Sequence, residues 1–299
     1  MAQAVETIVA PARPAERVAI QAAQEMRRRL LRHPSALAGG AIFVFMVVVA
    51  VLADYLAPFH PYEGYTVRNS LHPPGSPFWL GTDDVGRDIL SRMIHGARIS
   101  LTVGLVVQTI SITIGTTLGL IAGYFGRAID DLVSAVTTVF MAFPSLLFAI
   151  VVMAVIGPSI FNVFLALGVV TWPAVCRLVR GEVLSLKERE FVLAAHAIGA
   201  PAARTMLRHL LPNCAGPIIV VATLGMAGAI LAEASLSFLG LGVQPPTPSW
   251  GSMLAQGRDF MDQAWWMTTF PGAAIFVTIL GLNLLGDGLR DVLDPRLRV

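Results

Sequence analysis

Long runs of apolar residues alternate along the chain with shorter stretches that hold most of the polar and charged residues. Six of these runs reach the roughly 20 residues that an α-helix needs to cross the hydrocarbon core of a bilayer. They lie at residues 36–57, 98–123, 132–156, 159–178, 214–239 and 266–286. The pattern predicts an all-α membrane protein with six transmembrane helices.

The composition agrees with this prediction. Of the 299 residues, 55% are hydrophobic and 13% are charged, whereas about a quarter of the residues in a soluble domain are charged. We therefore expect the lipid bilayer to surround most of the chain. The net charge of +2 is too small to indicate a nucleic-acid partner.

The lysine and arginine residues predict the orientation of the helices, because these residues gather on the inner side of a membrane. With the N-terminus inside, five of the 21 fall outside and the other 16 fall inside. The five outer residues are Arg68, Arg87, Arg92, Arg98 and Arg258. Both termini are thus predicted to be cytoplasmic, and residues 1–33 are predicted to form a cytoplasmic arm.

One polar-bounded stretch, Glu190–Asn213, predicts a helix–turn–helix between two apolar segments; it reads EFVLAAHAIGAPAARTMLRHLLPN. Its Ala-Ala-x-x-x-Gly spacing uses small residues, so the backbone of another protein can approach closely. Gly199 permits a positive φ, and Pro201 limits the continuation of the first helix. Pro212 can begin the next helix, where its missing N–H costs nothing.

The first helix of this stretch has an apolar face with spacings of i, i+3, i+4 and i+7. The face is made of Phe191, Ala194, Ala195 and Ile198. On a loop outside the membrane such a face needs something to cover it. Either a partner protein or the membrane surface could do so.

Three further motifs follow a fixed order. They are LGTDDVGRDILSRMIHGARISL at 80–101, LAEASLSFLGLG at 231–242 and QPPTPSWGSML at 244–254. In the first, Thr82 or Asp83 is expected to cap a helix whose first turn holds Asp84 and Asp88. Cation binding by these acids is a possible alternative, but an interfacial helix explains them more simply.

Together the motifs resemble those of ABC importer permeases of the dipeptide, oligopeptide and nickel family, over residues 35–299. The stretch Glu190–Asn213 resembles the EAA loop by which such permeases dock on an ATPase. Two positions depart from the pattern. Leu193 occupies the position of the motif's Glu, and His209 replaces the usual apolar residue before Leu-Pro.

The resemblance implies a type I ABC importer permease bundle with both termini inside, in a bacterial or archaeal cytoplasmic membrane. Residues 34–299 would form the permease domain, with the coupling loop at 181–213. The expected docking residues are Glu190, Ala194, Ala195, Ile198, Gly199, Leu211 and Pro212. Implied partners are a homologous second permease, two ABC ATPases, an extracytoplasmic substrate-binding protein and a peptide substrate.

The chain itself is not expected to be an enzyme. Its one lysine, Lys187, lies outside any Gly-x-x-x-x-Gly-Lys pattern, which is the pattern that cradles phosphates. ATP and Mg²⁺ would therefore be bound by the partner ATPases, and no cofactor or metal is expected in this chain.

Glu233 is the acid placed well inside a predicted span. An ionisable group there is costly, so it must face protein or water. It could line the translocation path. Alternatively, it could make a structural hydrogen bond to Ser235, to Ser237 or to the partner permease.

Small residues and prolines also mark the predicted spans. A Gly-xxx-Gly-xxx-Gly ridge, which permits close helix packing, is formed by Gly115, Gly119 and Gly123. Prolines expected to kink the helices are Pro144, Pro173 and Pro271.

Several functions remain open. Within the same family, a nickel-chelate or glutathione permease is an alternative to a di- or oligopeptide permease. A secondary transporter would leave the Ala-Ala-x-x-x-Gly loop unexplained. An intramembrane enzyme would need a paired nucleophile and base at membrane depth, and no histidine lies beside a candidate serine within a predicted span.

Overall fold

The structure of the protein is a computed structural model that describes residues 28–62 and 69–293. Within these ranges the regular elements are helices, accompanied by a single isolated β-bridge between Thr82 and Asp88. This confirms the prediction of an all-α protein. Most of the proposed arm at residues 1–33 lies outside the described residues.

Five long helices form the body of the molecule. They are α2 (Pro34–Val51), α4 (Ile89–Phe125), α7 (Ile160–Leu186), α10 (Leu211–Phe238) and α12 (Trp266–Leu293). Shorter elements connect them: α3 (Ala53–Leu56), α5 (Arg127–Ala142), α6 (Ser145–Ile156), α8 (Glu190–Ala197), α9 (Ala202–Thr205), the π-helix η2 (Met206–Leu210) and α11 (Trp250–Arg258).

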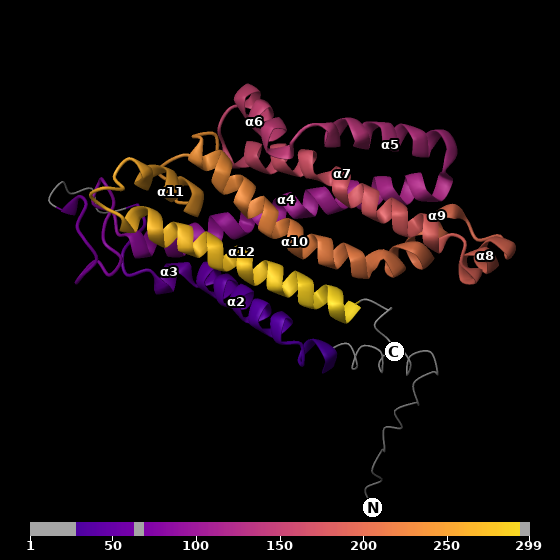
Figure 1. Ribbon diagram of the computed structural model, residues 1–299, viewed down its shortest axis with the longest axis horizontal. Coiled ribbons are helices and arrows are strands. Elements are labelled where there is room, and N and C mark those ends of the chain that lie inside the picture. The colour runs from indigo at the N-terminus through magenta and orange to yellow at the C-terminus, as the bar shows by residue number, and fades with distance from the viewer. Residues whose placement is uncertain (1–27, 63–68, 294–299) are drawn as a thin grey trace, which may run out of the picture.

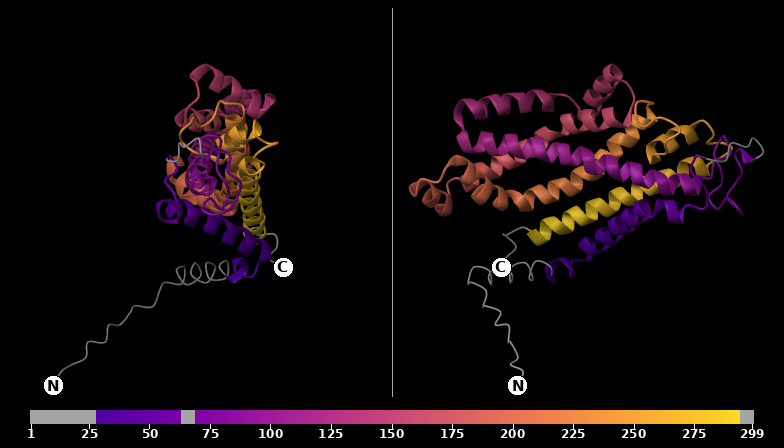
Figure 2. Two further views of the ribbon diagram at one scale, coloured as in Figure 1. Left: turned by 90° about the vertical axis from the view of Figure 1, so that its left-hand side faces the viewer. Right: turned by 180° about the vertical axis from the view of Figure 1, so that it is seen from behind.

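The long helices run side by side along an elongated molecule (Figure 1). Helices α8 and α9 lie at one end, and α3 and α11 lie at the other. Figure 2 shows α5 and α6 on one side of the central helices and α2 on the opposite side, next to α12. The extended shape therefore separates two loop regions by the full length of the bundle.

Among the described residues, five helical segments are long and apolar enough to cross a membrane, and the bent pair α5–α6 raises the number to six. With that pair counted as one span, the predicted number of six is met, and the kink predicted at Pro144 lies within it. The two halves are bent by 87°. Phe143 has an extended backbone, because the ring of Pro144 disfavours the helical conformation of the residue before it. Pro144 thus breaks the segment.

Several helices extend beyond their apolar runs. Helix α4 begins at Ile89 rather than at residue 98, and α7 continues to Leu186 rather than ending at 178. A hydropathy pattern ends where charged residues appear, whereas a helix continues as long as its backbone hydrogen bonds and packing persist.

The glycine ridge lies where α4 contacts α7. A Cβ added to Gly115 would lie 2.6 Å from the Cβ of Val175, and one added to Gly119 would lie 2.8 Å from the carbonyl oxygen of Cys176. At Gly123 it would lie 2.8 Å from Val183. The two helix backbones approach too closely for any side chain at these three positions.

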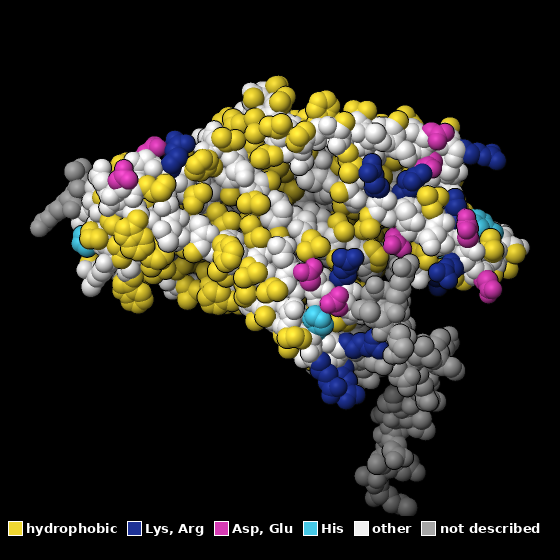
Figure 3. All heavy atoms as spheres, viewed as in Figure 1, with side chains coloured by type: hydrophobic (Ala, Val, Ile, Leu, Met, Phe, Trp, Pro, Cys, Tyr) yellow, Lys and Arg dark blue, Asp and Glu magenta, His cyan; other side chains and the backbone are white. Residues whose placement is uncertain are grey.

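The molecule's surface has an apolar middle. Figure 3 shows hydrophobic side chains over much of the elongated body, with charged side chains gathered toward its ends and around the start of α2. A bilayer favours this distribution, because its core excludes charge and its two surfaces accept it.

Candidate functional site

The stretch Glu190–Asn213 forms a short helix, a tight turn and a second helix. Helix α8 ends at Ala197, and Gly199 in the turn has φ of 76°. An L side chain rarely adopts that φ, so glycine is favoured at this position. Pro201 immediately precedes α9, where its missing N–H forfeits no helical hydrogen bond.

Helix α10 begins at Leu211 with Pro212 in its first turn, as predicted, but it continues a helix that begins earlier. That helix starts at Ala202 and runs through η2 into α10 without interruption. Inside a regular helix, Pro212 would leave the Arg208 carbonyl without a donor and crowd it with the ring. The wider π-turn at Met206–Leu210 relieves this crowding, and the side-chain amide of Asn213 donates to the His209 carbonyl at 2.6 Å.

The predicted apolar face of α8 is divided in the structure. Ala195 is buried together with Val192, and both lie against the bundle. Phe191 is 41% exposed and Ile198 is 84% exposed, and Ala194 is exposed as well. Helix α8 is therefore oriented with Val192 and Ala195 toward the bundle. The predicted face keeps only Phe191, Ala194 and Ile198 on the outside.

Contacts with α4 and α7 hold this loop in place, because Val192 of α8 packs in one cluster with Leu120 of α4 and Val183 of α7. The ring of His196 stacks on Tyr124 of α4 with centroids 5.8 Å apart, and Lys187 Nζ donates to the Gly123 carbonyl at 3.4 Å. Nearby, Arg180 Nη2 of α7 donates to Asp130 Oδ2 of α5 at 2.7 Å. A force applied to α8 would therefore pass directly to α4 and α7.

Glu233 is enclosed by protein. Its side chain has no exposed surface, and its Oε1 accepts hydrogen bonds from Ser237 Oγ at 2.7 Å and from Ser249 Oγ at 2.9 Å. Ser235 bonds instead to the carbonyl of Leu231. Of the two readings that the sequence left open, this geometry favours the structural hydrogen bond, since it joins α10 to the start of α11.

Ser249 is a residue that the sequence analysis did not single out. It begins α11 with a capping box in which its hydroxyl accepts from the Ser252 backbone N–H and its own N–H donates to Ser252 Oγ. The local signal, a serine three residues before another polar residue, was present in the motif. Nothing in the sequence paired it with Glu233.

The acids of the 80–101 motif have roles that differ from those predicted. Asp88, rather than Thr82 or Asp83, caps α4, and it accepts from the backbone N–H and the hydroxyl of Ser91 at 2.8 and 2.7 Å. Burial raises the pKa of Asp88, although the bonds from Ser91 oppose that rise. Asp83 accepts a hydrogen bond from Arg87 Nε at 2.6 Å, and this bond closes the turn that precedes α4.

Asp84 follows Asp83 in the same loop. Burial raises its pKa, and the adjacent charge of Asp83 raises it further. In the described part of the chain no three His, Cys, Asp or Glu side chains come together as a metal site would require.

Comparison with known proteins covers almost the whole chain. The family model described as the inner membrane component of binding-protein-dependent transport systems matches residues 115–299. A second model, the N-terminal transmembrane domain of oligopeptide transport permease C, matches residues 22–74.

Curated relatives are similar over most of their own length. A dipeptide transport system permease protein DppC of Alkalihalophilus pseudofirmus is 46% identical over 92% of this chain and 90% of its own. A di/tripeptide transport system permease protein of Pseudomonas aeruginosa is 44% identical over 89% of this chain and 90% of its own. A glutathione transport system permease protein of Pectobacterium atrosepticum is 42% identical over 92% of this chain and 91% of its own.

The first family model spans more than half of the chain, and the relatives exceed 40% identity over nearly all of it. The bundle of apolar helices agrees with a component that lies in the membrane. The chain therefore belongs to the family of inner membrane components of binding-protein-dependent transport systems, among its dipeptide and oligopeptide permeases.

Proposed function

We propose that this chain is the membrane-spanning subunit of an ATP-driven importer that carries di- and oligopeptides into a bacterial cell. The names of the relatives support the substrate class. One observation carries the mechanism: α8 presents exposed apolar side chains on a loop that is anchored to α4 and α7. A partner protein that binds this surface and moves could transmit its motion to these two helices.

In this account a separate pair of ATPases binds ATP and Mg²⁺ and docks on the loop 181–213 on the cytoplasmic side. Nucleotide-driven closure of the ATPases moves the loops, and the anchored helices follow. The bundle then alternates between states that open to opposite sides, and each nucleotide state selects one of them. A homologous second permease completes the path, and an extracytoplasmic binding protein delivers the peptide.

Glutathione import is a second candidate, because one relative with 42% identity is named as a glutathione permease. Competition for uptake between labelled dialanine and an excess of glutathione or of a second dipeptide separates the two. We expect the dipeptide to compete and glutathione to compete poorly.

The docking role is tested by changing the exposed tip of α8. We expect Ile198→Asp to reduce both co-purification of the ATPases and peptide uptake by about ten-fold, since a charge would replace apolar contact at the centre of an interface. The Ile198 side chain is 84% exposed, so the variant should remain folded and membrane-inserted. Gly199→Trp should have the same effect by blocking close approach.

A matched control uses the other end of the molecule. Met261 is 54% exposed and follows α11, so Met261→Asp introduces the same charge far from the loop. We expect it to leave ATPase co-purification unchanged. Normal co-purification by both Ile198→Asp and Gly199→Trp would show that the loop does not dock an ATPase.

A further inference from the structure

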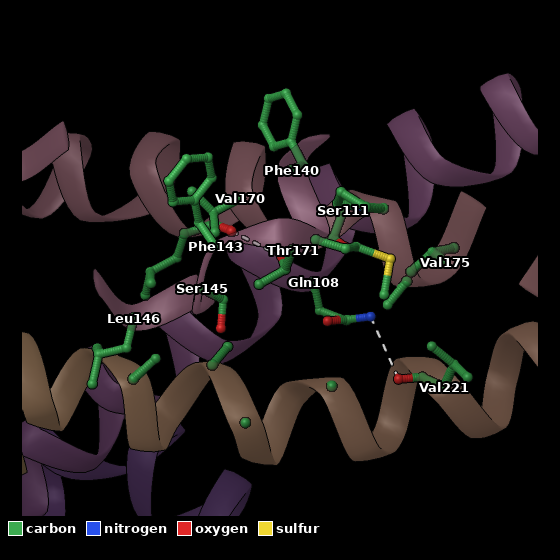
Figure 4. A pocket seen from close by; sticks show the side chains of 18 residues that line it. Gln108, Ser111, Phe140, Phe143, Ser145, Leu146, Val170, Thr171, Val175 and Val221 are labelled. Carbon is green, nitrogen blue, oxygen red and sulfur yellow. Dashed lines mark hydrogen bonds between the residues drawn. The ribbon is translucent and has the colours of Figure 1, made fainter. Parts of the chain in front are cut away.

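A cavity of about 460 Å³ lies among α4, α5, α6, α7 and α10, and Glu233 is not among the residues that line it. Its volume falls within the roughly 300–1,000 Å³ of typical small-molecule sites. Figure 4 shows its lining, which includes the aromatic side chains of Phe140 and Phe143 and polar side chains from α4. The bend at Pro144 places α5 and α6 around one side of this space.

Ser111 is the first polar group of interest in the cavity. Its side chain is 1% exposed, and its hydroxyl finds no hydrogen-bond partner among the described residues. A buried hydroxyl without a partner carries a free-energy cost. A ligand in the cavity would remove that cost by bonding to Ser111 Oγ.

Gln108 lies one helical turn before Ser111 on α4. Its Nε2 makes one long hydrogen bond of 3.5 Å to the Val221 carbonyl (Figure 4), and its Oε1 accepts none from the described residues. Gly225 makes room for this amide, because a Cβ there would lie 2.4 Å from Gln108 Oε1. The amide is thus held at the cavity with most of its bonding capacity unused.

The cavity lining contains no charged side chain. A carboxylate or an ammonium group would lose its hydration there without gaining a counter-charge, so the charged termini of a peptide would have to extend beyond the lining while its neutral amide lies within it. A neutral group that both donates and accepts hydrogen bonds suits the lining better. The peptide bond is such a group, and a side-chain amide can match both its N–H and its C=O.

We infer that this cavity holds the backbone amide of a peptide during its passage, with Gln108 and Ser111 as the residues that bond to it. The inference rests on the proposed function, and it assigns the substrate contact to α4 rather than to Glu233. Because every peptide has the same backbone, these contacts serve peptides of any sequence. The alternative occupant, a lipid chain, would require no polar partner.

The test uses the complete importer with its partner permease, ATPases and binding protein, reconstituted in vesicles and supplied with labelled dialanine. We expect Gln108→Leu and Ser111→Ala each to lower the uptake rate about five-fold, the loss that one hydrogen bond of about 1 kcal/mol implies. In both variants, the binding protein should stimulate ATP hydrolysis to within about two-fold of the rate in the importer without substitutions, because neither change alters the loop at α8.

The matched control is Thr278→Val. Thr278 of α12 is also 1% exposed with an unpartnered hydroxyl, but it lies outside the cavity lining, so uptake should not change. Gly225→Ala is a third variant. Its methyl group displaces the flexible end of Gln108, and uptake should fall as in Gln108→Leu.

Uptake by Gln108→Leu and Ser111→Ala that equals uptake by Thr278→Val would overturn the inference and favour a lipid-filled cavity. Poor assembly of the importer with Gln108→Leu, Ser111→Ala and Gly225→Ala would also overturn the inference, because it would show that these residues are structural. Failure of the proposed function looks different, because the unchanged complex would then transport no dialanine.

Discussion

A carboxyl group without exposed surface, Glu233, lies at the junction of α10 and α11. Both of its hydrogen-bond donors are neutral hydroxyls, Ser237 and Ser249, and its Oε2 has no partner among the described residues. A carboxylate so enclosed would need a counter-charge, whereas a neutral acid or an amide would not. We therefore expect the hydrogen bonds from Ser237 and Ser249 to depend on an acceptor oxygen at this position rather than on a negative charge.

This reasoning predicts that Glu233→Gln keeps the stability of the folded protein, because its Oε1 can accept the same two hydroxyl bonds. Glu233→Leu removes the acceptor of both buried hydroxyl hydrogens, and we expect it to lower the free energy of unfolding by about 1–3 kcal/mol. Thermal unfolding of the detergent-solubilised protein measures both. Equal destabilisation by the two changes would mean that the negative charge matters.

The Asp84 side chain should destabilise the folded state at neutral pH. Because burial and the nearby Asp83 raise its pKa, the folded protein binds this proton more tightly than the unfolded chain does. The free energy of unfolding therefore falls as the pH rises through the folded pKa. We expect Asp84→Asn to raise the unfolding temperature at neutral pH, by a stabilisation of about 1 kcal/mol or less.

Acidification provides the control for that experiment. As the pH falls below the ordinary range of carboxyl groups, Asp84 becomes neutral in both states, and the advantage of Asn should vanish. An advantage that persisted unchanged in acid would argue against a charge effect.

Single residues differed in how well the sequence could predict them. The positive φ of Gly199 and the helix-stopping role of Pro201 follow from local sterics and were predictable. The cap of α4 was misplaced, because several candidate side chains stand within seven residues and tertiary contacts select Asp88. The partnership of Glu233 with Ser249 depends on two elements meeting in space, which no local pattern encodes.

At the scale of helices, hydropathy predicted where the long elements lie but not where they break. The apolar run 132–156 is long enough for one span, and the restriction that Pro144 places on Phe143 divides it into two helices. The same residue type behaves differently at Pro173 and Pro271, which lie inside helices α7 and α12. Neighbouring helices and local adjustments can satisfy freed backbone groups in one place and not in another.

Close packing of α4 against α7 gives a prediction at this scale. Gly119→Leu would drive a side chain into the Cys176 carbonyl and Val179, and the two helices would have to separate. We expect a loss of at least about 1–3 kcal/mol, the usual cost of overpacking, measured as a lower unfolding temperature and a lower amount in the membrane.

Gly181 serves as the comparison for Gly119, because it lies in α7 with nothing within 4 Å of an added Cβ. Gly181→Ala should leave stability unchanged or raise it slightly, since alanine favours helices. If Gly119→Leu were as stable as Gly181→Ala, the ridge would not be a packing surface.

The whole molecule has two ends of different character. One carries the anchored loop with its exposed apolar tip at α8, and the other carries α3, α11 and the segment before α4 (Figure 1). The family could be predicted because several motifs occur in a fixed order along the chain. The cavity beside Gln108 could not, since its lining comes from five helices and its polar residues have no motif of their own.

The central claim is that the loop 181–213 lies on the cytoplasmic side and receives work from a separate ATPase. The most direct measurement is labelling of Ile198→Cys with a membrane-impermeant maleimide, since the native thiols Cys176 and Cys214 are buried. We predict labelling in inverted vesicles but not in intact cells, with protection when the ATPases are bound. Labelling in intact cells, or labelling that bound ATPases leave unchanged, would contradict the account.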